Sequence, residues 1–139
     1  MIYKRCSRCG KRIPSGSRCS CLKERHREYD RFSRDRKSKD FYGSSEWEKA
    51  REDALEADAG IDVYVYMTTG EIVAADMVHH ITPLRDDWKR RNDIDNLMSL
   101  SSVTHSVIEA LYKQDKEGTK RKLYEMLTQF RRKVRAGAV

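Results

Sequence analysis

The chain has 139 residues, which suits one small domain or a small domain with an appended segment. Its 29 Lys and Arg against 22 Asp and Glu give a net charge of +7, and a mean hydropathy of -0.85 indicates a small buried core. The longest apolar runs, such as residues 61–67, are far shorter than a membrane-spanning helix, and the N-terminus lacks the apolar core of a signal peptide. These features disfavour membrane and secreted proteins, so we expect a cytoplasmic protein.

The charge is divided unevenly along the chain. Residues 1–40 carry 14 Lys and Arg against 5 Asp and Glu, residues 41–118 carry 8 against 16, and residues 119–139 carry 7 against 1. Basic ends suit contacts with the phosphates of a nucleic acid, and an acidic centre suits divalent cations. Because both basic ends are long and one-sided, we expect them to contact DNA. The alternative is charge that only keeps the protein in solution.

All four cysteines lie near the N-terminus, as the pair Cys6 and Cys9 and the pair Cys19 and Cys21. Two thiolate pairs separated by a turn can close a tetrahedral metal site, and a segment this short needs such a constraint in order to fold. We therefore predict a zinc knuckle over residues 1–24. Its zinc would be structural, because four thiolates leave no open position for water. Disulfides are the alternative, disfavoured because nothing else in the chain indicates secretion.

A basic stretch at residues 25–43 follows the cysteines. It is rich in Arg and Lys and poor in apolar residues, so we interpret it as a linker with some helical character. Its cations could follow a DNA backbone or simply remain solvated. His26 belongs to this stretch, and its distance from the other histidines argues against a part in catalysis.

A helix and two strands are predicted after the linker. Ser45 and Glu48 have the spacing of a capping box, so the helix should begin near Ser45 and end at Gly60. Residues 61–67 and 72–78 are rich in β-branched and aromatic residues, which predicts two strands.

The predicted strands form a hairpin around a turn at residues 68–71, and the hairpin ends at His79 and His80. Neighbouring residues on a strand point to opposite faces, so the two histidines should have different roles. Asn96 follows, and His105 lies near the start of a further predicted helix. Together they supply what metal-assisted phosphodiester cleavage needs: metal ligands, a base to deprotonate water, and an amide to orient that base. The alternative is a set of ordinary core or surface histidines.

From about residue 41 to residue 109 the chain resembles the HNH endonuclease family, and in particular the small HNH proteins of bacteriophages. The resemblance rests on FYGSSEW at residues 41–47, VHHITPL at 78–84, DNLMSL at 95–100, and His105. A His doublet before Ile-x-Pro-Leu, then Asp-Asn-Leu and a His at this spacing, is a specific combination.

The resemblance implies an α+β fold, in which a ββα-metal core of the His-Me finger type at residues 44–118 is flanked by helices. It implies hydrolysis of DNA phosphodiester bonds, by nicking or double-strand cleavage, with one divalent metal: Mg, Mn, Ni or Zn. Relatives of this type commonly act with the phage terminase in DNA packaging. Terminase or portal proteins are therefore expected partners, in the host cytoplasm if a phage encodes the chain.

The resemblance also implies roles for individual residues. His80 would be the general base, and Asn96 would fix the orientation of its ring. His79 and His105 would bind the metal. Glu109, four residues after His105 and so on the same helical face, would be a further ligand. The alternative for Glu109 is that it faces solvent or pairs with a basic neighbour.

The chain departs from the family where many relatives have a second zinc site. The positions of those cysteine pairs are residues 62–65 and 101–105 here, and they contain no cysteine. We therefore expect packing to hold the core. The predicted core residues are Val63, Val65, Ile72, Val78, Leu97, Leu100, Val107 and Leu111.

Two basic elements complete the prediction. Arg85, Lys89, Arg90 and Arg91 lie in the loop after the doublet, where they could bind a DNA phosphate or remain solvated. Residues 119–139 are predicted to form a basic amphipathic helix, separated from the preceding helix by a break at Gly118. Its apolar stripe, which we expect to dock on the core, is Leu123, Met126, Leu127, Phe130 and Val134.

Two other functions remain compatible with the sequence. A non-catalytic DNA-binding packaging accessory protein would use the HNH fold as a scaffold, but it has no need for the complete set of His79, His80, Asn96 and His105. A zinc-dependent regulator would bind DNA through the knuckle. It is the weaker alternative, because one small knuckle without a recognition helix binds mainly by charge.

Overall fold

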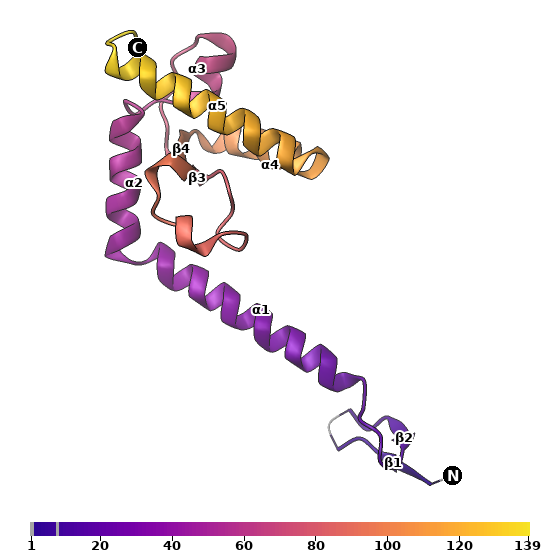
Figure 1. The fold of residues 1–139 in the computed structure, drawn as a ribbon. Coiled ribbons are helices and arrows are strands. Elements are labelled where there is room, and N and C mark those ends of the chain that lie inside the picture. Colours follow the sequence, from indigo (N-terminus) through magenta and orange to yellow (C-terminus); the bar gives the residue numbers. More distant parts are fainter. Residues whose placement is uncertain (1, 8) are drawn as a thin grey trace. The chain divides into compact units, whose positions relative to one another are not determined.

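A computed structural model describes residues 2–7 and 9–139, with the backbone alone for residues 22–26, 28–32 and 34. The chain divides into two compact units, Met1–Asp40 and Phe41–Val139 (Figure 1), and each is considered by itself. In the described part of the chain, no helix combines the length and the apolar character needed to cross a bilayer. The side chain of His26 lies outside the described residues.

The first unit is a small hairpin followed by a helix. Strands β1 (Tyr3–Arg5) and β2 (Arg12–Pro14) pair antiparallel, and Gly10 turns the chain between them with φ of 73°. Helix α1 (Cys21–Tyr42) begins at the last cysteine. The residues that we interpreted as a linker form most of α1, and no Gly or Pro interrupts residues 22–42.

The second unit begins with α2 (Ser45–Ala57), close to its predicted position. The N-cap is Ser44 rather than Ser45: its hydroxyl accepts a hydrogen bond from the backbone N–H of Trp47 at 3.2 Å. The predicted capping box with Glu48 is therefore wrong by one residue.

Residues 61–67 do not form the predicted strand, because Val63–Thr69 is the helix α3. The carboxylate of Asp62 caps its start by accepting from the Val65 N–H at 2.9 Å. Gly70 ends it in the left-handed conformation, with φ of 79°. The two caps outweigh the β-propensity of the valines and tyrosines between them, and no turn joins strands at residues 68–71.

The strand predicted at residues 72–78 begins only at Met77, and it has a different partner from the one predicted. Strand β3 (Met77–His80) pairs antiparallel with β4 (Leu97–Leu100), with His79 opposite Met98 and His80 opposite Leu97. The loop between them holds two short 3-10 helices, η1 (Trp88–Arg90) and η2 (Ile94–Asn96). Helix α4 (Ser102–Gln114) follows β4 directly. Strands β3 and β4 with α4 form the expected ββα core.

Hydrogen bonds join the positions at which many HNH relatives have a zinc site. The Asp62 carboxylate accepts from the N–H and the hydroxyl of Ser101, each at 2.9 Å. Ser101 in turn caps α4 by accepting from the Thr104 N–H at 3.3 Å. The start of α3 and the start of α4 are thus connected by polar side chains as well as by packing.

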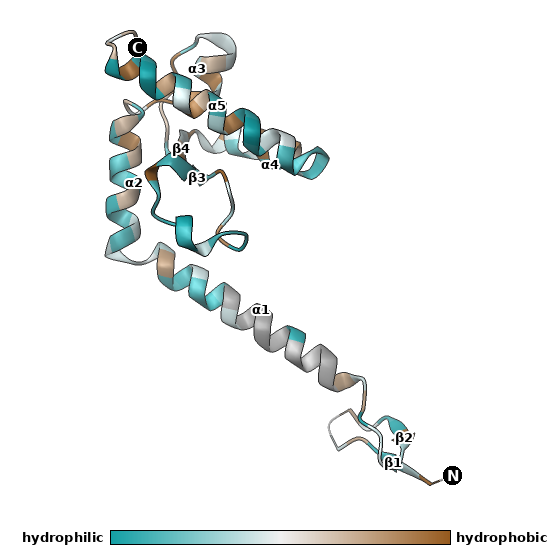
Figure 2. Ribbon diagram, in the orientation of Figure 1, coloured by the Kyte–Doolittle hydropathy of each residue, from teal (hydrophilic) through white to brown (hydrophobic). Residues whose placement is uncertain are grey.

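The last helix, α5 (Lys116–Arg135), begins earlier than predicted, and Gly118 lies inside it. The break falls at Asp115, whose carboxylate accepts from the Gly118 N–H at 3.0 Å. A Cβ at Gly118 would lie 2.1 Å from that carboxylate, so the glycine is what permits the close approach. Figure 2 shows hydrophilic and hydrophobic residues alternating along α5, as an amphipathic helix requires.

Half of the predicted core residues are buried in the second unit. Val63, Val78, Leu97 and Leu100 are buried, as are Leu123, Leu127 and Phe130 of the predicted α5 stripe, with Met126 and Val134 packed against them. Val65 and Leu111 are half-buried. The prediction is wrong for Ile72 and Val107, which are 72% and 49% exposed. Ile72 precedes β3 in a segment without regular structure, and Val107 lies on the outer face of α4.

A buried ion pair connects four elements of this unit. Arg131 on α5 donates to both oxygens of Asp58, at 2.8 Å and 3.4 Å, and to the carbonyls of Ile94 and Leu97, each at 2.6 Å. The same carboxylate accepts from the Ser99 N–H at 2.9 Å. Asp58 has no exposed surface. The end of α2, η2, β4 and α5 are therefore held together by one pair of charges.

The substitution Asp58→Asn should destabilise the fold, because it leaves the Arg131 guanidinium buried without its counter-charge. We expect the free energy of unfolding to fall by about 3 kcal/mol, measured by urea denaturation and far-UV circular dichroism. The matched control is Asp53→Asn on the exposed face of α2, where Lys49 Nζ lies 3.9 Å from Asp53 Oδ2. That control should lose about 0.5 kcal/mol or less. Equal losses in the two variants would contradict the role assigned to the buried pair.

Candidate active site

The two histidines of the doublet end β3 and have different surroundings, as strand alternation predicts. His79 faces α4, where its ring centroid lies 5.2 Å from that of His105. His80 stacks on Trp47 of α2, with centroids 4.9 Å apart and the rings 24° from parallel. Both are buried, at 6% and 7% exposure. The two rings can therefore serve separate chemical roles.

His79, His105 and Glu109 form a cluster suited to a divalent cation. One ligand atom of each lies within 4.8 Å of the others, and His105 Nε2 is 3.2 Å from Glu109 Oε1. Burial decreases across the cluster: His79 is buried, His105 is half-buried and Glu109 is exposed. Two imidazoles and one carboxylate suit a transition metal and leave positions for water and a phosphate oxygen.

The proton on His79 can be assigned from its neighbours. Tyr112 donates its hydroxyl hydrogen to the carbonyl of Ile81 at 2.5 Å, because a carbonyl oxygen can only accept. The Tyr112 oxygen also lies 3.1 Å from His79 Nε2, so that nitrogen must carry the proton and donate. The lone pair of His79 is therefore on Nδ1, the atom left for a metal. Burial, and after it the proximity of His105 and His80, lowers the pKa of His79 to about 3, so the ring is neutral at pH 7.

The same reasoning applies to His80. Its Nε2 lies 2.9 Å from the carbonyl oxygen of Arg91, so Nε2 carries the proton and Nδ1 has the free lone pair. Burial lowers the pKa of His80, although the hydrogen bond to Arg91 opposes this shift. A neutral imidazole with one free nitrogen can accept a proton from water.

Asn96 is fully buried and contacts the loop rather than the His80 ring. Its Oδ1 accepts from the Thr82 N–H at 2.8 Å and from the Tyr124 hydroxyl at 2.6 Å. Its Nδ2 donates to the carbonyls of Thr82 at 3.0 Å and Arg90 at 3.4 Å. The Arg90 carbonyl directly precedes the Arg91 carbonyl that holds His80, so Asn96 acts on the ring through the backbone.

The four cations predicted to bind DNA fall into two groups. Arg85 and Lys89 are exposed. Arg90 donates to Asp93 at 2.9 Å and to Tyr124 at 2.8 Å, while Arg91 donates to the Trp88 carbonyl at 3.1 Å and lies over the Trp88 ring. Two of the four guanidinium or ammonium groups are thus engaged inside the protein.

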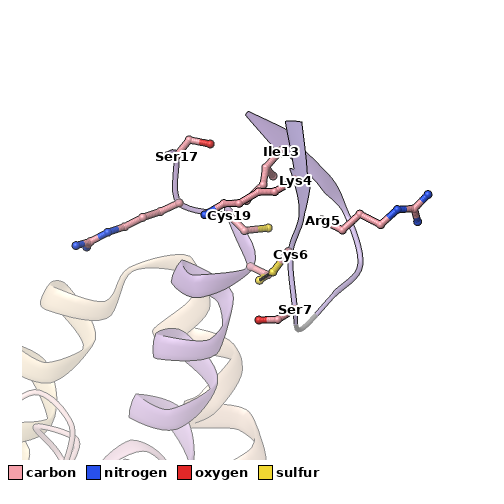
Figure 3. A pocket seen from close by; sticks show the side chains of 9 residues that line it. Lys4, Arg5, Cys6, Ser7, Ile13, Ser17 and Cys19 are labelled. Atoms are coloured by element: carbon pink, nitrogen blue, oxygen red, sulfur yellow. Dashed lines mark hydrogen bonds between the residues drawn. The ribbon is translucent and has the colours of Figure 1, made fainter. Parts of the chain in front are cut away.

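The four cysteines of the first unit come together, as predicted. No disulfide joins these four residues: the Sγ atoms are 3.6 Å apart in the Cys6–Cys21 pair and 3.5 Å apart in the Cys9–Cys19 pair, and all four lie within 4.8 Å of one another. Cys6, Cys19 and Cys21 border a hollow of about 490 Å³, which Figure 3 shows with Lys4 and other lining side chains. Four sulfurs at this spacing fit one tetrahedral metal ion.

The sequence prediction missed Tyr112, Tyr124 and Trp47 as parts of the site. Tyr112 lies seven residues after His105 on α4, so helical periodicity could have indicated it. Tyr124 comes from α5, and no local signal in the sequence connects it with Asn96.

Comparison with known proteins agrees with this geometry. The crystal structure of the HNH endonuclease of the deep-sea thermophilic bacteriophage GVE2, with manganese ion, is similar to this chain, with a TM-score of 0.58 and 38% sequence identity. The match covers 63% of this chain and 94% of that one. No family model and no curated protein matches the chain. The chain belongs to the HNH endonuclease family, and it is a metal-dependent nuclease.

Removing the Tyr112 hydroxyl should weaken metal binding at the cluster, because His79 Nε2–H then loses its acceptor and the ring loses its fixed orientation. We expect Tyr112→Phe to lower the affinity for Mn²⁺ by roughly tenfold or more, measured by titration calorimetry. The control is Tyr64→Phe, a half-buried tyrosine on α3. An unchanged affinity in folded Tyr112→Phe would show that the hydroxyl does not support the ligand.

Proposed function

We propose that the protein hydrolyses DNA phosphodiester bonds with one divalent cation held by His79, His105 and Glu109, and with His80 as the general base. The proposal rests on which ring nitrogens of His79 and His80 are free. Both rings have Nε2 engaged in a hydrogen bond, which leaves Nδ1 of His79 for the cation and Nδ1 of His80 for a proton. Membership of the HNH family supports DNA as the substrate.

The residues support a direct hydrolysis. His80 Nδ1 takes a proton from water while the water oxygen bonds to phosphorus, and the bond from phosphorus to the leaving sugar oxygen breaks. A bound divalent cation would stabilise the negative charge that develops on the phosphate and the leaving oxygen. The Arg91 carbonyl keeps the proton on His80 Nε2, and Asn96 holds the backbone that carries this carbonyl.

The nature of the cation follows from the donor set. Magnesium prefers oxygen ligands, whereas two imidazoles favour manganese, nickel or zinc. The structure of the GVE2 enzyme contains manganese, and the similarity between the chains supports manganese here.

Two basic regions are proposed to contact the DNA backbone. Arg85 and Lys89, exposed in the loop after the doublet, would bind phosphates near the cleavage site. Arg90 and Arg91 would act mainly by shaping this loop, since their side chains are engaged within it. The exposed cations of α5 form the second basic region: Arg121, Lys122, Arg132, Lys133 and Arg135.

A structural zinc ion is proposed at Cys6, Cys9, Cys19 and Cys21. Hydrogen bonds from Cys19 and Cys6 raise the pKa of the Cys21 thiol to about 12, so this thiol keeps its proton unless a cation replaces it. Soft sulfur ligands select zinc over magnesium or manganese.

The phage origin of the GVE2 enzyme supports a role in phage DNA packaging, with terminase or portal proteins as partners. A non-catalytic packaging accessory protein is the alternative. It would need the fold but not the free Nδ1 atoms of His79 and His80.

The test is cleavage of supercoiled plasmid with magnesium, manganese, nickel or EDTA. Wild type should nick or linearise DNA with a metal and not with EDTA, and His80→Ala should lose at least roughly 100-fold in rate, because the proton acceptor is gone. His26→Ala serves as the control histidine and should cut like wild type. If wild type bound DNA and cut nothing with any metal, the accessory protein would replace the nuclease.

The proposed zinc can be tested separately. The full chain should bind one zinc ion, and cobalt substitution should give the absorption bands of thiolate ligands. Cys9→Ser should lose both, because a tetrahedral site then lacks one sulfur, yet it should bind Mn²⁺ at the histidine cluster with wild-type affinity. Retention of zinc in this variant would contradict the knuckle.

A further inference from the structure

The hydroxyl of Tyr124, on α5, contacts three points of the loop between β3 and β4. Its oxygen lies 2.5 Å from Thr82 Oγ1, 2.8 Å from Arg90 Nη1 and 2.6 Å from Asn96 Oδ1. Thr82 lies just after β3, Arg90 is in η1, and Asn96 ends η2 directly before β4. One oxygen atom thus connects the beginning, the middle and the end of the loop.

The direction of each bond follows from the chemistry of the partners. Asn96 Nδ2 faces two backbone carbonyls, so the atom that faces Tyr124 is the amide oxygen, which can only accept. Tyr124 therefore donates its single hydroxyl hydrogen to Asn96. Thr82 and Arg90 must then donate to the Tyr124 oxygen. One hydrogen given and two received use the full capacity of a phenol.

Asn96 is equally saturated, and it has no exposed surface. Its oxygen accepts from the Thr82 N–H and from Tyr124, and its nitrogen donates to the carbonyls of Thr82 and Arg90. Without the Tyr124 hydroxyl, the buried amide oxygen would lose one of its two donors. Buried polar groups that lose a partner reorganise or destabilise their surroundings.

The network reaches the doublet through two successive carbonyls. Asn96 binds the carbonyl of Arg90, and His80 Nε2 donates to the carbonyl of Arg91 at 2.9 Å. The side chain of Arg90 donates to the Tyr124 hydroxyl, and its guanidinium also lies 5.1 Å from the centroid of the Tyr124 ring. The position of the carbonyl that orients His80 therefore depends on bonds that converge on Tyr124.

We infer that Tyr124 is a positioning residue for the cleavage reaction: it fixes Asn96 and the loop backbone, and through them the ring of His80. The inference rests on the proposed function, and it assigns part of the active site to a helix outside the β3, β4 and α4 core. The hydrogen bonds of the Tyr124 hydroxyl run to Thr82, Arg90 and Asn96, and none of these residues belongs to the cation cluster. Its removal should affect the rate of the chemical step and leave metal binding unchanged.

The kinetic test compares Tyr124→Phe with wild type on plasmid DNA. We expect kcat to fall roughly tenfold while KM and the affinity for Mn²⁺ stay within about twofold, because DNA and metal contacts are retained. Tyr66→Phe is the matched control: Tyr66 lies on α3, and its ring packs on Phe130 of α5, with centroids 5.6 Å apart. A wild-type kcat in folded Tyr124→Phe would overturn the inference.

A double-mutant cycle tests the route through Asn96. In an Asn96→Ala background, Tyr124→Phe should change kcat by less than about twofold, because the group through which it acts is absent. Thr82→Val removes a donor to Tyr124 while the bond from Tyr124 to Asn96 remains, so its effect on kcat should be smaller than that of Tyr124→Phe. Additive effects of the two changes at Asn96 and Tyr124 would overturn the route.

Nuclear magnetic resonance of the metal-free protein gives a readout that needs no cleavage. The Nε2–H of His80 and the amide N–H of Thr82 should exchange slowly with solvent in wild type and at least roughly tenfold faster in Tyr124→Phe, while amide protection in α4 is retained. Equal exchange in the two proteins would overturn the inference. If wild type cuts no DNA, the proposed function fails, and the exchange rates still decide whether Tyr124 fixes His80.

Discussion

The buried pair of Asp58 and Arg131 is the constraint on which the second unit depends. Asp58 accepts from Arg131 and from the backbone of β4, and Arg131 also holds the carbonyls of Ile94 and Leu97. Strand β4 is the partner of β3, which carries the histidine doublet. Because both side chains are buried, the carboxylate and the guanidinium must pair with each other in one geometry. The pair therefore specifies the arrangement of the elements rather than merely adding stability.

The site divides two proposed chemical roles between the adjacent residues His79 and His80. Strand alternation sends His79 toward α4 and His80 toward α2, and in each case an oxygen acceptor holds the proton on Nε2. The acceptors differ: a tyrosine hydroxyl supports His79, and a backbone carbonyl supports His80. The proposed metal-binding half therefore depends on α4, whereas the proposed base depends on the loop and on α5. Both halves rely on residues that do not react.

The residues that gather at the site could be named from the sequence, but the groups that support them could not. His79, His80 and His105 were identifiable because few residue types bind metals or accept protons near neutral pH, and Asn96 was identifiable from its place in the motif. The strand predicted at residues 61–67 was wrong, because side-chain shape favours a strand there while the caps at Asp62 and Gly70 form a helix. The engagement of Arg90 by Tyr124 could not be predicted, since 34 residues separate them.

The replacement of cysteines by hydrogen-bonding side chains shows how the core tolerates such a departure. Asp62 and Ser101 occupy positions that carry zinc ligands in many relatives, and they bond to each other directly. An Asp and a Ser hold two helix starts together without requiring a metal or a reducing environment. At these two positions the fold of the nuclease core is therefore held by hydrogen bonds rather than by thiolates.

The place of α5 in the chain sets the order in which the site can be completed. Every residue of the HNH motif has been synthesised by Glu109, yet the partners of Asn96 and Asp58 follow at Tyr124 and Arg131. The Asp58–Arg131 pair spans 73 residues, and a contact of this sequence separation requires the closure of a large loop. A growing chain on the ribosome thus carries the complete motif before the side chains that hold the loop in place have been made.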